Sequence, residues 1–241
     1  MNIRIFDHAE QVGQAAATIM AAQVLEKPAA VLGLATGSSP VPAYRQLIRM
    51  HQSGALDFSQ VTSFNLDEYV GIPEDHPCSY HRFMQENLFG QVNIPSDNTH
   101  VPDGNGVNLE ETARAYDEAI QAAGGIDLQL LGIGRNGHIG FNEPGDEFIW
   151  GCHVVTLTES TIDANKRFFA SEADVPRKAI SLGVGAIVAA RKVLLIATGK
   201  DKAEAIRGAV QGDVSPRLPA SILRTHPQVT FLLDRDAASL L

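Results

Sequence analysis

Short runs of consecutive apolar residues alternate along the chain with longer segments in which apolar residues recur every three or four positions. The short runs are typical of strands buried on both faces of a parallel sheet, and the longer spacing is typical of amphipathic helices. Strands are expected at residues 3–6, 29–35, 61–66, 126–133, 153–157, 179–184, 192–197 and 229–233. Helices are expected at residues 9–25, 40–51, 80–89 and 109–123, and after residue 200.

This alternation of strands and helices predicts an α/β fold. Because consecutive strands are separated by helices, we expect a doubly wound, mostly parallel sheet with helices on both faces, a Rossmann-like arrangement. We find no internal repeat, low-complexity run or linker, so residues 1–241 are expected to form a single catalytic domain.

The most informative stretch is residues 130–144, where the strand expected at 126–133 ends in a loop that contains several glycines. Glycine lets the backbone adopt positive φ and approach a ligand closely. The loop carries Asn136, His138 and Glu143. A histidine in a tight loop is often incidental, but His138 lies between glycines and close to a carboxylate. Because open α/β sheets place their sites at the carboxyl ends of strands, we predict that these residues belong to an active site.

The segment 132–137 also matches the Gly-x-Gly-x-x-Gly fingerprint of dinucleotide-binding folds, and Glu159 lies at roughly the distance expected of a ribose-binding acid. That fingerprint requires a helix that begins at its last glycine, so that the pyrophosphate lies at the helix N-terminus. Here Gly140, Asn142, Pro144 and Gly145 occupy the positions where the helix would grow. A nicotinamide-dependent enzyme is therefore disfavoured.

A second loop, Thr-Gly-Ser-Ser-Pro at residues 36–40, follows the strand expected at 29–35. Ser39 is a suitable N-cap and Pro40 a suitable first helical residue. A helix N-terminus preceded by such a loop presents backbone N–H groups and the positive end of the helix dipole to an anion. We therefore favour phosphate binding over a plain turn. The predicted anion-binding residues are Thr36, Gly37, Ser38 and Ser39.

Asp67 follows the strand expected at 61–66 and should lie at the same sheet edge as the two loops, so we predict it as a base. Lys166 and Arg167 form either a solvated helix face or, through the guanidinium fork of Arg167, a phosphate contact. Lys202 lies about one turn after the strand expected at 192–197, in another strand, turn and helix unit.

The net charge of −9 and the isoelectric point near 5.3 argue against nonspecific nucleic-acid binding, which needs a basic surface. An anionic substrate would need a locally basic pocket.

The two cysteines, Cys78 and Cys152, form no disulfide framework, as expected in a reducing compartment. The N-terminus lacks the features of a signal peptide, and the apolar patch at 15–25 is too short to span a bilayer. We expect a soluble cytoplasmic protein.

Four segments together resemble a known family. They are Leu-Asp-Glu-Tyr-Val-Gly at 66–71, the loop at 132–144 with its Gly-His-Ile-Gly-Phe-Asn-Glu-Pro, Ala-Asn-Lys-Arg-Phe-Phe at 164–169 and Ser-Leu-Gly-Val-Gly at 181–185. In this order, over nearly the whole chain, they are similar to the glucosamine-6-phosphate deaminase family. The resemblance implies conversion of glucosamine 6-phosphate and water to fructose 6-phosphate and ammonia in amino-sugar catabolism, with no metal and no organic cofactor.

The resemblance also implies roles for the site residues. His138 would move a proton between the C1 hydroxyl and the ring oxygen, with Glu143 orienting its imidazole. Asp67 would then transfer a proton from C2 to C1, a kind of step typically worth ~10²–10⁴ in rate. The residues that match the phosphate-binding positions of the family are Thr36, Gly37, Ser38, Ser39, Arg167 and Lys202.

The chain departs from the family pattern in two places. Asn136 stands where many members carry an aspartate, so we expect Asn136 to orient His138 and Glu143 to be the only ionised partner of that histidine. The segment 145–150, Gly-Asp-Glu-Phe-Ile-Trp, is acidic and apolar where longer members bind an allosteric sugar phosphate. We expect hyperbolic kinetics, a monomer or small homo-oligomer with no nucleic-acid or membrane partner, and a core position for Trp150.

Two alternatives remain open. A 6-phosphogluconolactonase-like hydrolase would share the fold but would need no base for abstraction of a carbon-bound proton. A non-enzymatic sugar-phosphate sensor domain would need only the binding residues. The presence of Asp67, His138 and Glu143 together favours an enzyme over a sensor.

Overall fold

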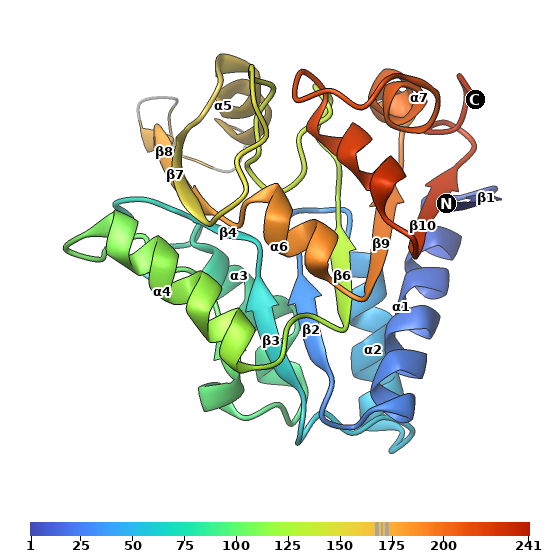
Figure 1. The fold of residues 1–241 in the computed structure, drawn as a ribbon. Helices are drawn as coiled ribbons and strands as arrows, with labels where there is room; N and C mark the ends of the chain where they lie inside the picture. Colours follow the sequence, from blue (N-terminus) through green and yellow to red (C-terminus); the bar gives the residue numbers. More distant parts are fainter. Residues whose placement is uncertain (167–168, 170, 172–173) are drawn as a thin grey trace.

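The computed structural model describes residues 1–166, 169, 171 and 174–241 (Figure 1). Within them, seven strands form one parallel sheet, and its spatial order is β1-β10-β9-β6-β2-β3-β5. These strands are β1 (Asn2–Phe6), β2 (Val31–Leu34), β3 (Thr62–Asn65), β5 (Thr99–His100), β6 (Leu128–Leu131), β9 (Lys192–Ala197) and β10 (Val229–Asp234). The predicted α/β class is confirmed.

Helices cover both faces of this sheet, with α4 and α6 in front of it and α2 and α3 behind it in Figure 1. The α-helices are α1 (Ala9–Glu26), α2 (Val41–Gln52), α3 (Tyr80–Asn87), α4 (Leu109–Ala122), α5 (Glu159–Asn165), α6 (Val184–Ala189) and α7 (Ala203–Gln211). Short 3₁₀ helices occur at Phe89–Gln91, Ser96–Asn98, Lys200–Lys202 and Pro219–Thr225. In the part of the chain that is described, no helix is long and apolar enough to cross a membrane.

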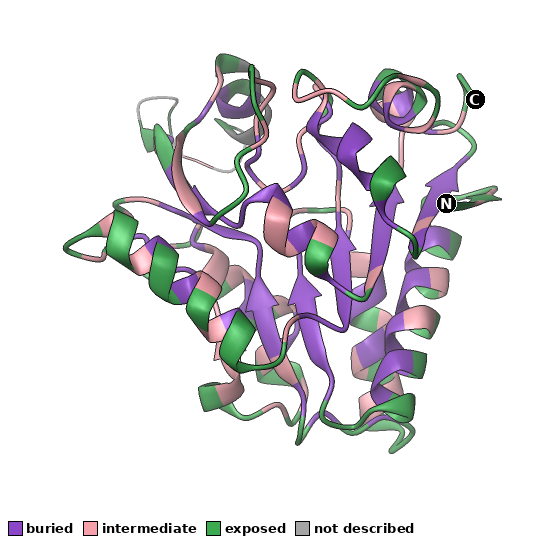
Figure 2. Ribbon diagram, viewed as in Figure 1, coloured by how far each residue is buried: buried purple, intermediate pink, exposed green. Residues whose placement is uncertain are grey.

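The central strands are buried along their whole length, as the purple ribbons of Figure 2 show. Every residue of β6 is buried, and Leu130 and Leu131 have no exposed surface. A strand with helices on both faces has no polar side, so its sequence is a continuous apolar run rather than an alternating one. This explains why the runs at residues 29–35, 126–133 and 192–197 predicted their strands well.

Three further strands form a separate antiparallel sheet in the order β4-β8-β7. They are β4 (Asp67–Tyr69), β7 (His153–Thr156) and β8 (Lys178–Ser181). Strands were expected at 153–157 and 179–184, and the structure places them in this second sheet rather than in the parallel one. An apolar run reveals that a strand is buried but not which strand it pairs with, and β8 is buried because it lies between β4 and β7.

The entry into α2 also differs from the prediction. Pro40, not Ser39, occupies the N-cap position, and no side chain caps the helix. The cause lies in the preceding turn: Gly37 has a φ of 90°, and Pro40 already has helical dihedral angles. Instead, the Tyr44 hydroxyl donates a 2.6 Å hydrogen bond to the carbonyl of Ala35, which ties the helix to the end of β2.

Candidate active site

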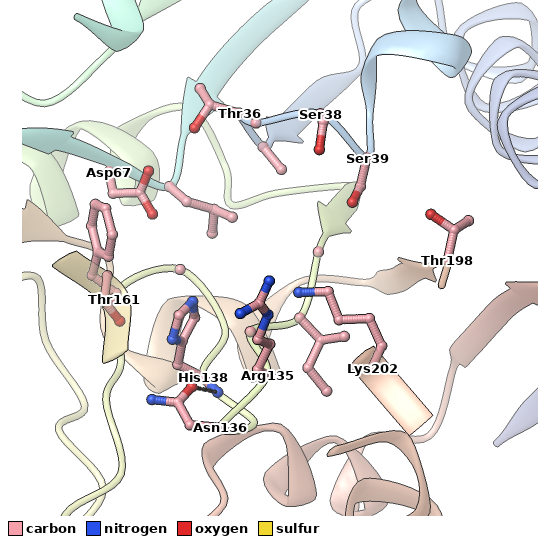
Figure 3. Close-up of a pocket in the computed structure, with 18 of the residues that line it drawn as sticks. Thr36, Ser38, Ser39, Asp67, Arg135, Asn136, His138, Thr161, Thr198 and Lys202 are labelled. Carbon is pink, nitrogen blue, oxygen red and sulfur yellow. Dashed lines mark hydrogen bonds between the residues drawn. The ribbon is translucent and has the colours of Figure 1, made fainter. Parts of the chain in front are cut away.

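A cavity of about 330 Å³ opens at the carboxyl ends of β2, β3, β6 and β9 (Figure 3). Pockets for small molecules usually lie in this size range and at this edge of an open parallel sheet. The polar residues that line it are Thr36, Ser38, Ser39, Asp67, Tyr80, Arg135, Asn136, His138, Thr161, Thr198, Asp201 and Lys202. The loops that the sequence singled out therefore meet at one place.

The turn at residues 36–39 forms one wall of the cavity. Gly37 adopts a φ of 90°, which residues with a side chain rarely do, so a glycine is required for this turn. Lys202 lies across from the turn, as Figure 3 shows, at the position that precedes the first residue of α7. Arg167, the other predicted phosphate contact, lies outside the described residues.

Asp67 lies where the chain passes from the main sheet to the small one. The residue before it, Leu66, donates a 3.1 Å backbone hydrogen bond to Leu34 of β2 and accepts a 2.8 Å bond from Leu182. Asp67 itself pairs with Ser181 of β8. The Asp67 carboxylate is therefore held by backbone pairing to both sheets, and Figure 3 shows it pointing into the cavity.

The Asp67 carboxyl is only 6% exposed. Burial, assisted by the neighbouring charge of Glu68, raises the pKa of Asp67 to about 8. Glu68 points elsewhere: its carboxylate accepts hydrogen bonds from the backbone N–H groups of Tyr80 and His81 at 2.9 and 3.1 Å. It thereby holds the N-terminus of α3, whose first residue, Tyr80, lines the cavity.

The glycine-rich loop brings its backbone against the imidazole of His138. A Cβ atom added at Gly134 would lie 2.4 to 2.6 Å from three atoms of the His138 ring, so only glycine fits there. The loop is closed by a 2.9 Å bond from the N–H of Gly134 to the carbonyl of His138. Asn142 stabilises the next turn, because its amide donates to the carbonyls of Ile139 and Leu182.

His138 and Glu143 lie together as predicted from their spacing. Oε2 of Glu143 is 3.5 Å from Nδ1 of His138, and the glutamate side chain is 7% exposed. Among the described residues, Glu143 is the carboxylate within 4 Å of this imidazole. Burial acts to raise the pKa of Glu143, but His138, Thr161 and Asn136 outweigh it, and the pKa is lowered.

Asn136 contacts the carboxylate rather than the imidazole. Its Nδ2 donates a 2.8 Å hydrogen bond to Oε2 of Glu143, and its Oδ1 accepts a 3.2 Å bond from the backbone N–H of His138. The expectation that Asn136 orients His138 therefore takes a specific form: the amide acts through Glu143 and through the backbone.

Five of the polar lining residues were not predicted as site residues: Tyr80, Arg135, Thr161, Thr198 and Asp201. Thr161, in the first turn of α5, donates a hydrogen bond to Oε1 of Glu143. Arg135 and Asp201 form an ion pair, with Nε 3.0 Å from Oδ2. The only available signal for Arg135 was its place inside the glycine-rich loop.

Trp150, expected in the core, is 58% exposed, because the segment around it crosses the surface next to Gly183 and Gly185.

Within the described chain, no three His, Cys, Asp or Glu side chains are arranged to hold a metal ion. The cavity brings the carboxyl of Asp67 and the imidazole of His138 together with the turn at residues 36–39. Asp67, at the start of β4, and His138, in the glycine-rich loop, face the same space, as Figure 3 shows.

Comparison with known proteins agrees with this geometry. The profile of the family described as glucosamine-6-phosphate isomerases/6-phosphogluconolactonase matches residues 6–232. The chain belongs to this family. Among its relatives, the glucosamine-6-phosphate deaminase of Thermoanaerobacter pseudethanolicus is 53% identical over all of this chain and 95% of its own length. That of Halothermothrix orenii is 52% identical over the full length of both chains.

Solved structures of family members have the same fold. A monomeric glucosamine-6-phosphate deaminase superposes with a TM-score of 0.98 at 47% identity, over the whole of both chains. The 6-phosphogluconolactonase of Trypanosoma brucei superposes with a TM-score of 0.79 at 21% identity, over 100% of this chain and 98% of its own. The second similarity concerns the fold alone.

Proposed function

We propose that the protein converts glucosamine 6-phosphate and water to fructose 6-phosphate and ammonia. The observation that carries this proposal is the convergence of Asp67, His138 and the 36–39 turn on one cavity. A base, a proton shuttle and an anion site are the parts that this reaction needs. The deaminases that are 52–53% identical over the whole chain support the same assignment.

The phosphate of the substrate would bind at the 36–39 turn, opposite Lys202. The backbone N–H groups of the turn and the N-terminal end of α2 favour an anion there. By the family resemblance Arg167 would add a forked contact, while Lys202 acts as a point charge. A phosphate held at this end places the sugar ring between His138 and Asp67.

The first chemical step is ring opening at His138. Because Glu143 lies beside Nδ1, it favours the tautomer with a proton on Nδ1 and leaves Nε2 for the substrate. Nε2 takes the proton of the C1 hydroxyl, and the imidazolium that forms is stabilised by Glu143. The same group then delivers a proton to the ring oxygen as the C1–O5 bond breaks.

The second step is isomerisation at Asp67. Its carboxylate removes the proton from C2 to form an enolamine and returns a proton to C1, which leaves an iminium group at C2. Water adds to C2, and ammonia leaves as the C2–N bond breaks. In the empty site the carboxyl is largely protonated near neutral pH, and the substrate ammonium would favour its ionised form.

Release of ammonia from glucosamine 6-phosphate by the purified protein tests the proposal directly. Asp67→Asn is expected to lower this rate by ~10²–10⁴ while sugar-phosphate binding persists. A lactonase, in contrast, would hydrolyse 6-phosphogluconolactone and keep that activity in the variant. No ammonia from the unmodified protein would refute the proposal.

We also propose that the protein is a cytoplasmic monomer with one catalytic domain. Residues of both sheets contribute to the cavity, which supports a single domain. The solved deaminase that superposes with a TM-score of 0.98 is monomeric, which supports a monomer. Neither Cys78 nor Cys152, both of which the structure describes, is in a disulfide, in keeping with a reducing compartment. Sedimentation analysis and cell fractionation test these points, and a monomer should show hyperbolic kinetics.

A further inference from the structure

We propose that Arg135 is an additional phosphate-binding cation of this site, and that Asp201 holds its side chain when the site is empty. The inference rests on the proposed function, because it deepens the account of how that site binds a sugar phosphate. Arg135 was singled out neither by the sequence motifs nor by the family resemblance.

The position of Arg135 supports this role. It follows β6 in the glycine-rich loop, and Figure 3 shows its guanidinium group in the cavity beside the ammonium group of Lys202. Nε of Arg135 lies 3.0 Å from Oδ2 of Asp201, and Nζ of Lys202 lies 3.7 Å from the same oxygen. One carboxylate oxygen therefore lies close to two cations that border the cavity.

The charges of the described residues that line the cavity favour such a role for Arg135. Four lining residues of the described chain carry acidic, Lys or Arg side chains: Asp67, Arg135, Asp201 and Lys202. Asp67, with its pKa raised to about 8 by burial, is mostly neutral near pH 7. Asp201 and Lys202 offset each other, so Arg135 makes this set positive. In a protein of net charge −9, that local charge is what a phosphate monoester of about −1.5 to −2 needs.

The ion pair with Asp201 can be exchanged at little cost. Its two side chains are 55% and 45% exposed, and exposed ion pairs contribute little to stability. The bond to Asp201 is made through Nε, so the two terminal nitrogens of the guanidinium can bind phosphate oxygens in a fork. A phosphate seated between the 36–39 turn and Lys202 would lie within reach of this group.

The chain offers a matched control in Arg207. This arginine borders a neighbouring groove that also touches the outer side of Arg135. It is 53% exposed and pairs with Glu204 at 2.7 Å, so its exposure and pairing resemble those of Arg135. It does not line the cavity. Arg207→Gln therefore changes the net charge of the protein as much as Arg135→Gln does, but it leaves the proposed contact between Arg135 and phosphate in place.

The test measures binding of inorganic phosphate by calorimetry in Arg135→Gln, Arg207→Gln and the unmodified protein. Loss of a charge-assisted hydrogen bond should weaken phosphate binding by about 10- to 100-fold in the Arg135 variant and leave the Arg207 variant unchanged. In turnover, KM for glucosamine 6-phosphate should rise by a similar factor while kcat stays within about threefold. Asp201→Asn should tighten phosphate binding, because it removes the competing carboxylate.

Three results would overturn the inference. They are an unchanged phosphate affinity in Arg135→Gln, an equal loss in both arginine variants, and a fall in kcat without a fall in phosphate affinity. Weaker phosphate binding in Asp201→Asn would overturn the role given to Asp201. Because phosphate binding is measured without turnover, absence of ammonia release would refute the deaminase assignment and leave this test intact.

Discussion

The amide of Asn136 donates a 2.8 Å hydrogen bond to the Glu143 oxygen that lies 3.5 Å from His138 Nδ1. The other oxygen of Glu143 accepts a bond from Thr161. The carboxylate is thus held from two sides, by a loop and by a helix, with the imidazole as its third neighbour. A substitution of Asn136 or Thr161 should therefore affect His138 through the Glu143 carboxylate.

Asn136→Asp should move the pH–rate profile to higher pH by about one unit. The substitution replaces a donor with a second carboxylate beside Glu143, so the two acids titrate as a pair and the added negative charge favours the protonated imidazole. The measurement is kcat/KM between pH 5 and 9. Asn136→Ala, which removes the donor without adding charge, serves as the control and should shift the profile less. Identical profiles for all three proteins would show that residue 136 is not coupled to His138.

Thr161→Val should lower kcat by about 10- to 100-fold and move the acid limb of the profile upward, because it removes a hydrogen bond that lowers the pKa of Glu143. Thr161→Ser keeps the hydroxyl and should restore both. Thr158→Ala removes the N-cap of α5 and the 3.2 Å bond that the Thr158 hydroxyl donates to Oγ1 of Thr161, but it keeps the Thr161 hydroxyl that contacts Glu143. If Thr158→Ala matched Thr161→Val, the helix cap rather than the hydroxyl would be responsible.

The Asp67 carboxyl of the ligand-free protein should titrate near pH 8, since burial and the charge of Glu68 raise its pKa to about that value. Carboxyl ¹³C NMR measures this directly, with Asp67→Asn to assign the signal. The free enzyme's kcat/KM should accordingly rise up to about pH 8. A midpoint near the ordinary aspartate value would mean that water reaches the carboxyl and that the proposed burial is incorrect.

Asp67→Asn should stabilise the fold at alkaline pH. Because the pKa of Asp67 is raised on folding, its contribution to stability is complete below its unfolded value of about 3.8 and is lost as pH rises through about 8. The variant, which stays neutral, should match the wild type near pH 4 and exceed it by at least about 2 kcal/mol near pH 9. Urea unfolding at several pH values gives the comparison.

Residues that are close in sequence were the ones predicted well. His138 and Glu143 are five positions apart in one loop, so their pairing could be inferred without a structure. Asp67 and the 36–39 turn could be placed near them because parallel strands end at a common edge. Thr161 could not, since nothing local indicates that the first turn of α5 packs against Glu143.

The strands of the small sheet show a different limit. Apolar runs predicted β7 and β8, but their pairing partners depend on where the chain turns after Asp67, which no periodicity encodes. Helix α6 was missed because six residues, Val184–Ala189, are too few to show a helical period. The cap of α2 was assigned to Ser39 from its residue type, whereas Gly37 and Pro40 set the turn geometry.

The backbone pairing on both sides of Leu66 places Asp67 at the junction between the main sheet and the small one. Engineering that reshapes the paired strands β7 and β8 would disturb the base before it disturbed the 36–39 turn, which follows β2 of the main sheet. Catalytic turnover would then fail while ligand affinity survived. These two strands are therefore the region to vary when the goal is a sugar-phosphate receptor that binds its ligand without converting it.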